Sequence, residues 1–307
     1  MKNFKIVILP VLALALVLGF KVVSSGAEEF EIKQRIVELP ADAVGELLGS
    51  DTLDPQEVKT MSEKLFALPV EQVIQESSTQ DVAPEVSSNT FYVSGKKIRV
   101  DTTEEEEKVT SMALLDEGKV YTIFWAKKQY MELSIDRIRQ MQKQASEALK
   151  KLPGMEEALE KLPPEIRAQM KANLGKTEEG TSSVKVTKTG HSATVNGIEC
   201  EEYLAETQTG ETQLCVCKEF PELRKSFDLF MEAFPGFEGL AEEQNTEKIL
   251  KEIPNGWPVL IKELKFDPLA MEFSFDVAEI LSVEKKDLPP DTFRVPTDFM
   301  KVAAPAQ

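Results

Sequence analysis

Short alternating segments separated by tight turns run from residue 90 to residue 133, and they constrain the fold more than any other part of the sequence. Ser94-Gly95 separates FYV from KKIRVDT, and Asp116-Glu117-Gly118 separates VTSMALL from KVYTIFW. A third turn, Lys127-Lys128-Gln129, leads into YMEL. Glycine in a short turn between alternating segments is typical of a β-hairpin. We therefore predict an antiparallel meander.

The segment 119–126 is unusual because both of its faces are apolar. One face carries Tyr121, Ile123 and Trp125, and the other carries Val120, Phe124 and Ala126. A strand of an antiparallel sheet with one face in water shows only one apolar row. We therefore expect this strand to be covered on both sides, by a helix or by a lid.

The remaining segments predict further strands and several helices. Apolar residues at helical spacing predict a helix over 134–152, and Pro163-Pro164 begins another at 165–174. Asp54 and Pro55 are suited to the start of a helix that runs to residue 68. We predict further helices at 221–234 and 246–253. We predict single strands at 29–39, 70–79, 257–266 and 271–286, and a set of several strands over 184–218. The predicted fold class is α+β, with a large antiparallel sheet interrupted by helical segments.

The N-terminal residues 1–27 resemble a secretory signal peptide. A short basic start precedes a 15-residue apolar segment, and Ser25 and Ala27 are small residues at the positions expected for cleavage. An uncleaved N-terminal anchor is the alternative, and Lys21 favours it. No cysteine precedes Cys200, so there is no lipid-attachment site at the cleavage point. We expect an exported protein, in the periplasm or cell envelope, cleaved near Ala27.

The charge of the chain excludes one class of partner. The formal net charge is −17, and removal of residues 1–27, which contain three lysines and no acidic residue, lowers it to −20. Such a protein is repelled by nucleic acids and by anionic membrane surfaces. We expect no nucleic-acid partner.

Three cysteines lie in a predicted hairpin, and alternation places Cys200, Cys215 and Cys217 on the same face. A disulfide from Cys200 to either of the other two fits this geometry and leaves one free thiol. A three-thiolate metal site assisted by His191 is less consistent with the spacing, because structural metal sites usually use two short ligand pairs. We predict no metal site and no cofactor.

The sequence contains no recognisable catalytic arrangement. His191 is the only histidine, and it falls in a predicted turn where no nucleophile is placed beside it. No group of aspartates has the spacing of a calcium loop. We therefore do not expect an enzyme.

Five segments in a fixed order resemble a known family. They are YVSGKKIRVDTT, LLDEGKVYTIFWAKKQYMEL, LPPEIRAQM, VTKTGHSATVNGIECEEY and LPPDTFRVPTDFMKV. Together they resemble the exported bacterial family known as domain of unknown function 4412, over residues 90–300. At TQLCVC the family is expected to have a tryptophan, so the cysteines there depart from its pattern. Residues 28–89 carry no such resemblance.

The resemblance implies a fold but no activity. The order of strands and helices is similar to the periplasmic lipoprotein-carrier fold, in which helices cap an incomplete antiparallel barrel around an apolar cavity. The family has no established activity, so it supplies no catalytic residue. A fold by itself is weak support for a function.

On this basis we expect an exported cell-envelope protein that binds a hydrophobic ligand, such as a lipid, an acyl chain or a lipidated protein. The expected lining consists of Ile98, Val100, Tyr121, Ile123 and Trp125, with Met141 in a helical lid. One alternative is that these side chains fill a core without a ligand. Another is an envelope scaffold that binds a protein partner.

The expected organisation follows from these assignments. We predict a signal peptide at 1–27 and a strand–helix–strand extension, joined to the main sheet, at 28–89. The main α+β domain occupies 90–300, and 301–307 form a tail.

Overall fold

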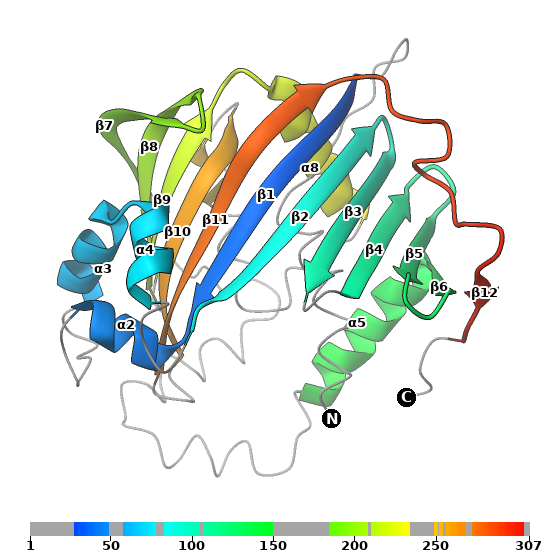
Figure 1. Cartoon of the computed structure of the whole chain (residues 1–307), viewed down its shortest axis with the longest axis horizontal. Coiled ribbons are helices and arrows are strands. Elements are labelled where there is room, and N and C mark those ends of the chain that lie inside the picture. Colours follow the sequence, from blue (N-terminus) through cyan, green and yellow to red (C-terminus); the bar gives the residue numbers. More distant parts are fainter. Residues whose placement is uncertain are drawn as a thin grey trace.

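The protein contains one large β-sheet with helices on both faces (Figure 1). The computed structural model describes residues 28–48, 58–77, 83–104, 107–149, 184–207, 210–233, 249–250, 252–253, 256–267 and 272–303. The predicted signal peptide and the helix predicted at 165–174 lie outside these residues.

The sheet has twelve strands and is not closed. In chain order they are β1 (Glu29–Leu39), β2 (Glu85–Ser94), β3 (Lys97–Glu104), β4 (Glu107–Leu114), β5 (Lys119–Phe124), β6 (Gln129–Ser134), β7 (Lys185–Val195), β8 (Ile198–Glu206), β9 (Gly210–Cys217), β10 (Trp257–Asp267), β11 (Glu272–Lys285) and β12 (Met300–Lys301). Their spatial order is β12-β6-β5-β4-β3-β2-β1-β11-β10-β9-β8-β7. All neighbours are antiparallel except β12 and β6, which are parallel, so the sheet is mixed rather than purely antiparallel.

Local turn chemistry explains most of this order. The predicted meander is confirmed as β2–β6, and Gly95 and Gly118 adopt positive φ angles of 55° and 65° in its turns. Asn196 and Gly197, at φ 49° and 84°, make the turn between β7 and β8. Glycine adopts such angles without the steric cost that other residues meet. The second meander, β7–β11, lies on the other side of β1.

Strand β1 joins the two meanders. It pairs with β2 from Glu29 to Glu38 and with β11 from Phe30 to Leu39. The first strand of the predicted 28–89 extension therefore lies in the middle of the sheet.

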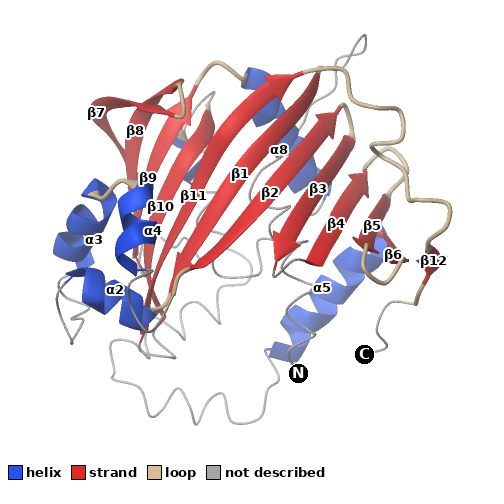
Figure 2. Ribbon diagram, in the orientation of Figure 1, coloured by secondary structure: helices blue, strands red, loops and turns tan. Residues whose placement is uncertain are grey.

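In the part of the chain that the structure describes, five helices are divided between the two faces (Figure 2). On one face lie α2 (Ala41–Leu48), α3 (Val58–Ala67) and α4 (Val70–Ser77); on the other lie α5 (Ile135–Leu149) and α8 (Pro221–Ala233). We call the face covered by α5 and α8 the inner face and the opposite one the outer face. Within the described residues, none of the helices has the length and apolar character needed to cross a bilayer.

The prediction of a strand at 70–79 is wrong, because this segment forms α4. Val70, Val73 and Ser77 are buried on one side of that helix, at helical rather than alternating spacing. Pro69 accepts the first hydrogen bonds of the helix, from Gln72 and Val73.

Three clusters of buried apolar side chains hold the sheet and helices together. The largest covers the inner face and includes Ile135 of α5 and Leu223 of α8. The second lies on the outer face beneath α2–α4 and includes Leu65 and Phe275. The third, also on the outer face, combines Met112, Leu114 and Tyr121 with Phe293 and Val295 of the C-terminal segment.

Candidate ligand-binding face

Two rows of apolar side chains cross the inner face on adjacent strands. The backbone register places Phe30, Val93, Ile98, Ala113 and Val120 in one row, and Ile32, Phe91 and Val100 in the next. None of these eight side chains is more than 3% exposed. Directly paired residues on neighbouring strands point to the same face, so these residues form one continuous apolar surface.

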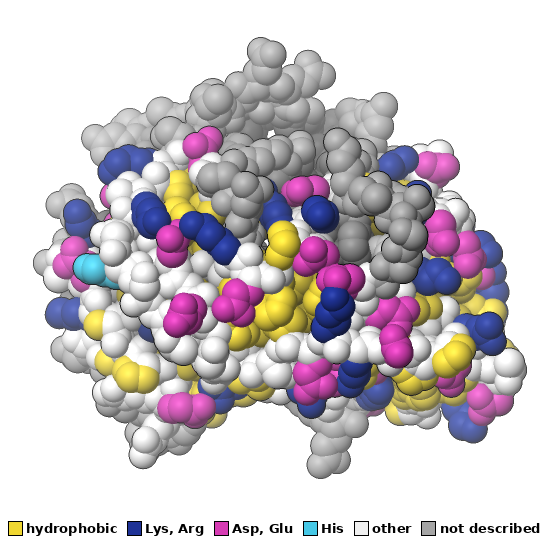
Figure 3. Space-filling model, turned by 90° about the horizontal axis from the view of Figure 1, so that it is seen from above, with side chains coloured by type: hydrophobic (Ala, Val, Ile, Leu, Met, Phe, Trp, Pro, Cys, Tyr) yellow, Lys and Arg dark blue, Asp and Glu magenta, His cyan; other side chains and the backbone are white. Residues whose placement is uncertain are grey.

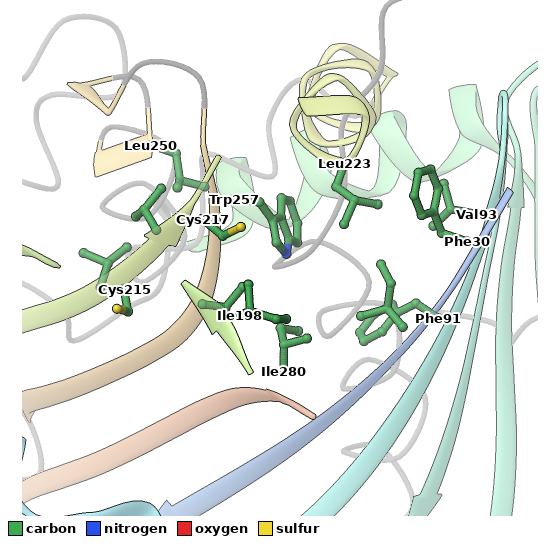
Figure 4. Close-up of a cluster of buried hydrophobic side chains, with 14 of the residues drawn as sticks. Phe30, Phe91, Val93, Ile198, Cys215, Cys217, Leu223, Leu250, Trp257 and Ile280 are labelled. Atoms are coloured by element: carbon green, nitrogen blue, oxygen red, sulfur yellow. The ribbon is translucent and has the colours of Figure 1, made fainter. Parts of the chain in front are cut away.

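Helix α8 and part of the second meander complete the cluster on this face. Leu223 projects from α8 toward the strands that carry Phe30 and Phe91 (Figure 4). Trp257 of β10 and Ile280 of β11 belong to the same cluster; in this view Trp257 lies beside Leu223, and Ile280 lies near Ile198. The inner face therefore combines side chains from both meanders.

Uncharged polar residues, among them Thr122 of β5, interrupt this apolar surface, and we call four of them the polar seam: Gln34 of β1, Asn89 of β2, Thr102 of β3 and Ser111 of β4. Gln34, Asn89 and Thr102 occupy one row across three strands. Ser111 lies in the next row, opposite Val100. All four are buried. The seam is difficult to predict from the sequence, because its four residues are brought together only by the alignment of separate strands.

The residues predicted to line one pocket lie on opposite faces. Ile98 and Val100 lie on the inner face, whereas the register pairs Tyr121 with Met112 and Ile123 with Thr110 on the outer face. Trp125, which follows β5, also lies on the outer side and contacts Thr110.

Met141, the predicted lid residue, lies on α5 and is partly buried. That helix contacts the inner-face cluster through Ile135 and Ile138. A single surface made of all six predicted residues is therefore not formed.

A buried carboxylate, Asp101 of β3, organises the polar part of the outer face. Arg99 donates from Nε and Nη2 to its two oxygens at 2.7 and 2.9 Å, Lys108 lies 2.7 Å away, and Thr110 donates at 2.6 Å. Burial alone would raise the pKa of Asp101, but the hydrogen bonds from Arg99, Lys108 and Thr110 outweigh it and lower that pKa. The carboxylate is therefore ionised and held by three donors.

Aromatic residues surround these charges and connect them to the C-terminal segment. The indole of Trp125 donates to the Thr110 hydroxyl at 2.8 Å and packs edge-on against Phe299, with ring centroids 5.3 Å apart. Arg99 also donates to the Thr292 carbonyl at 2.9 Å, and its guanidinium lies 5.4 Å from the Tyr92 ring centroid. These contacts fasten residues 292–299 to the sheet.

A buried lysine on β10 anchors helix α3. Lys262 is 5% exposed, and its Nζ donates to the carbonyls of Phe66 and Leu68 at 2.7 and 2.6 Å. These carbonyls lie at the end of α3, where backbone acceptors lack partners within the helix. Burial lowers the pKa of Lys262. Nearby, the Ser62 hydroxyl of α3 donates to Glu211 of β9.

An ion-pair network joins β1 to β11 and α4. Arg35 Nη2 lies 2.6 Å from Glu279 and 2.8 Å from Glu71. Asn196 donates to the other Glu279 oxygen at 3.1 Å and to the Ile280 carbonyl at 2.9 Å. Glu279 is an acidic residue within a largely apolar face of β11, and these partners account for its burial.

Cys200 and Cys215 form a disulfide that joins β8 to β9, with a Cα–Cα distance of 5.3 Å. Cys217 is free and buried, and burial raises the pKa of its thiol. Because two of the three sulfurs are bonded to each other, the three-thiolate metal site is not formed. Among the described residues, no group of three or more histidine, cysteine, aspartate or glutamate side chains is arranged to hold a metal ion.

His191 of β7 is exposed, with its Nδ1 3.6 Å from Glu202. Acidic and basic side chains are interspersed over the surface seen in Figure 3, with hydrophobic side chains between them. This view shows no region dominated by one sign of charge that would identify a highly charged partner.

Two solved structures show a distant likeness to this chain. One is the crystal structure of an uncharacterized conserved protein from Thermus thermophilus, with 7% sequence identity, a TM-score of 0.38 and 91% of each chain covered. The other is a structure of PNGF-II, with 9% identity and a TM-score of 0.24, covering 91% of this chain and 32% of that one. At these TM-scores neither structure assigns a fold or a function to this chain.

Comparison with curated proteins finds no match. The family described as domain of unknown function (DUF4412) matches residues 155–299. The resemblance inferred from the sequence is thereby confirmed over that range, and the quoted segments before residue 155 lie outside it. Residues 155–299 of this chain are thus similar to the DUF4412 family.

Proposed function

We propose that this is an exported cell-envelope protein that holds an acyl chain, from a lipid or a lipidated protein, against the inner face of its sheet. The observation that carries this proposal is the double row of eight apolar side chains across β1–β5, on the face where α5 and α8 lie. At a strand separation of about 4.8 Å, five strands span about 19 Å, which suits a long acyl chain.

The energetics favour such a ligand. Each methylene group removed from water contributes about 0.8 kcal/mol, so an acyl chain gains substantially from contact with this surface. The sheet is open rather than closed into a barrel. The similarity to the lipoprotein-carrier fold, inferred from the order of elements in the sequence, is consistent with this role.

Export is supported by two independent features. Residues 1–27 combine a basic start, an apolar segment and small residues before the expected cleavage point. The disulfide between Cys200 and Cys215 is typical of oxidising compartments outside the cytosol.

The test is to purify the protein from the exported fraction, extract it with organic solvent and identify bound lipid by mass spectrometry. We expect lipid in near-stoichiometric amount. The variant Ala113→Leu, which adds bulk to the inner face, should retain less lipid than the control Thr103→Leu, which adds bulk on the outer face. The absence of lipid, together with no uptake of the apolar fluorescent probe N-phenyl-1-naphthylamine by the extracted protein, would refute the proposal.

A second candidate is an envelope scaffold with a filled core and no small ligand. The observation that favours it is the low exposure of the same eight side chains, which is also what a packed core requires. A pull-down that returns one stoichiometric protein partner, from protein that carries no lipid, would support the scaffold instead.

We propose no catalytic role. His191 is exposed and its near neighbour is a carboxylate, while Asp101 is occupied by three donors. Catalysis by either residue would require a substrate to displace these contacts.

A further inference from the structure

The polar seam places buried polar side chains on an otherwise apolar surface. Gln34, Asn89 and Thr102 are 6%, 2% and 5% exposed, and Ser111 is fully buried. Burying uncharged polar groups costs free energy unless hydrogen bonds compensate for the lost water. Such groups persist in a protein interior when they have partners or a function.

The hydrogen bonds within the seam all run in one direction. Thr102 Oγ1 donates to Asn89 Oδ1 at 2.8 Å, and Asn89 Nδ2 donates to Gln34 Oε1 at 3.3 Å. Both amide oxygens therefore accept, and the amide nitrogen of Gln34 is not used by these bonds.

Ser111 supplies a second observation that points to a ligand. Its hydroxyl is fully buried and has no hydrogen-bond partner among the described residues. It lies between Val100 and Thr122 in the same cross-strand row, and is diagonal to Thr102. A buried donor without a partner in the middle of an apolar face is suited to an acceptor brought by a ligand.

Resting on the acyl-binding function proposed above, we propose that the polar seam binds the carbonyl oxygen of a neutral acyl ester or amide. The carbonyl accepts a hydrogen bond from the Ser111 hydroxyl. The alkyl chain extends across the strands over the two apolar rows, from Val100 toward Phe91. The seam thus selects an acyl compound over a hydrocarbon of the same length.

The absence of charge among the seam residues defines the ligand class further. Gln34, Asn89, Thr102 and Ser111 are all uncharged, so a carboxylate or phosphate bound among them would be buried without a counter-ion from the seam. A carbonyl oxygen requires only donors. The seam therefore fits glycerides and acylated amines better than free fatty acids or phosphate groups.

The test uses the full mature chain after lipid extraction and two probes with the same alkyl chain. One is 1-monooleoylglycerol, which has an ester carbonyl, and the other is its ether analogue, 1-O-oleylglycerol, which has none. Each is titrated against protein loaded with N-phenyl-1-naphthylamine, and displacement of the fluorescence is measured. The wild type should bind the ester about tenfold more tightly than the ether, as expected for one additional hydrogen bond.

The variant Ser111→Ala should lose this preference while binding the ether as the wild type does. The control Ser88→Ala, on the exposed outer side of β2, should keep it. Removing an unpaired buried hydroxyl does not destabilise a fold, so Ser111→Ala should keep or raise the melting temperature.

The outcomes separate the two proposals. If neither probe displaces the dye and the dye itself does not bind, the acyl-binding function fails. If both probes bind equally in the wild type, the role of the seam is refuted while acyl binding stands. If Ser111→Ala lowers the melting temperature and weakens both probes alike, the hydroxyl is structural and the inference is overturned.

Discussion

Replacement of Asp101 by asparagine should destabilise the protein strongly, although the change preserves shape. The carboxylate accepts two hydrogen bonds from Arg99 and one from Thr110, and Lys108 lies 2.7 Å away. Asparagine keeps one oxygen acceptor but loses the charge. Arg99 and Lys108 would then lie against a neutral group.

The magnitude follows from how well each partner is shielded from water. The side chains of Arg99 and Asp101 are 14% and 8% exposed, and breaking such a buried pair costs about 3–5 kcal/mol. Lys108 is 42% exposed, so its contribution is about 1 kcal/mol or less. Arg99 keeps its bond to the Thr292 carbonyl. We expect a loss of about 3 kcal/mol in the free energy of unfolding.

Urea unfolding followed by tryptophan fluorescence measures this loss, and Trp125 reports directly on the cluster. At a slope of about 3 kcal/mol per molar urea, the midpoint should fall by about 1 M. The control is Asp136→Asn, because that carboxylate is 84% exposed and lies 3.3 Å from Arg139 in a surface ion pair. The control should change stability by less than about 0.5 kcal/mol.

The dependence on pH provides a second measurement. The folded-state pKa of Asp101 is lowered, so its contribution is complete above the unfolded value of about 3.9 and is lost as the pH falls through the folded value. The stability difference between the wild type and Asp101→Asn should therefore shrink below about pH 4. Two results would refute the reasoning. One is a loss of less than about 1 kcal/mol in the free energy of unfolding of Asp101→Asn at neutral pH. The other is a stability difference between the wild type and this variant that does not change in acid.

Two further predictions concern the sulfur atoms and the buried lysine. Titration of the unreduced, denatured chain should detect one thiol, and Cys217→Ser should abolish it; two or more thiols in the wild type would contradict the pairing of Cys200 with Cys215. Lys262→Met should cost about 1–3 kcal/mol in urea unfolding, because the two carbonyls at the end of α3 lose their donor, whereas Lys185→Met, at an exposed ion pair, should cost little. An equal effect of the two substitutions would show that Lys262 does not anchor the helix.

The parts of the fold that depend on local chemistry were predictable from the sequence. The meander β2–β6 follows from alternating segments and glycine turns, and each of its hairpins joins neighbours in the chain. The predicted helix at 134–152 is present as α5, from Ile135 to Leu149. Such elements require no knowledge of distant partners.

The incorrect strand at 70–79 has a physical explanation. Its β-branched residues favour a strand, but a segment of about eight residues carries too little periodic information to separate the two structures. Packing decides instead, because Val70 and Val73 are buried against the sheet only when the segment is helical.

The face of the sheet on which each predicted lining residue lies depends on the register between neighbouring strands. The sequence does not specify this register. Ile98 and Tyr121 belong to strands separated by β4, so their relative orientation depends on the alignment of two hairpins. A shift of one residue in either hairpin transfers a whole row to the other face. Contacts such as that between Arg99 and Thr292, which are 193 residues apart, likewise leave no local signal.

The central position of β1 has a consequence for how this protein must be made. One edge of β1 pairs with β2, the next strand in the chain. The other edge pairs with β11, which is synthesised much later. The contact between Arg35 and Glu279, for example, joins residues 244 positions apart. Pairing over such a separation is slow, and an unpaired strand edge in the meantime is prone to aggregate. Until β11 has been synthesised, the two meanders cannot pair through β1. The first strand of the sheet to be synthesised is therefore the one that later joins its two halves.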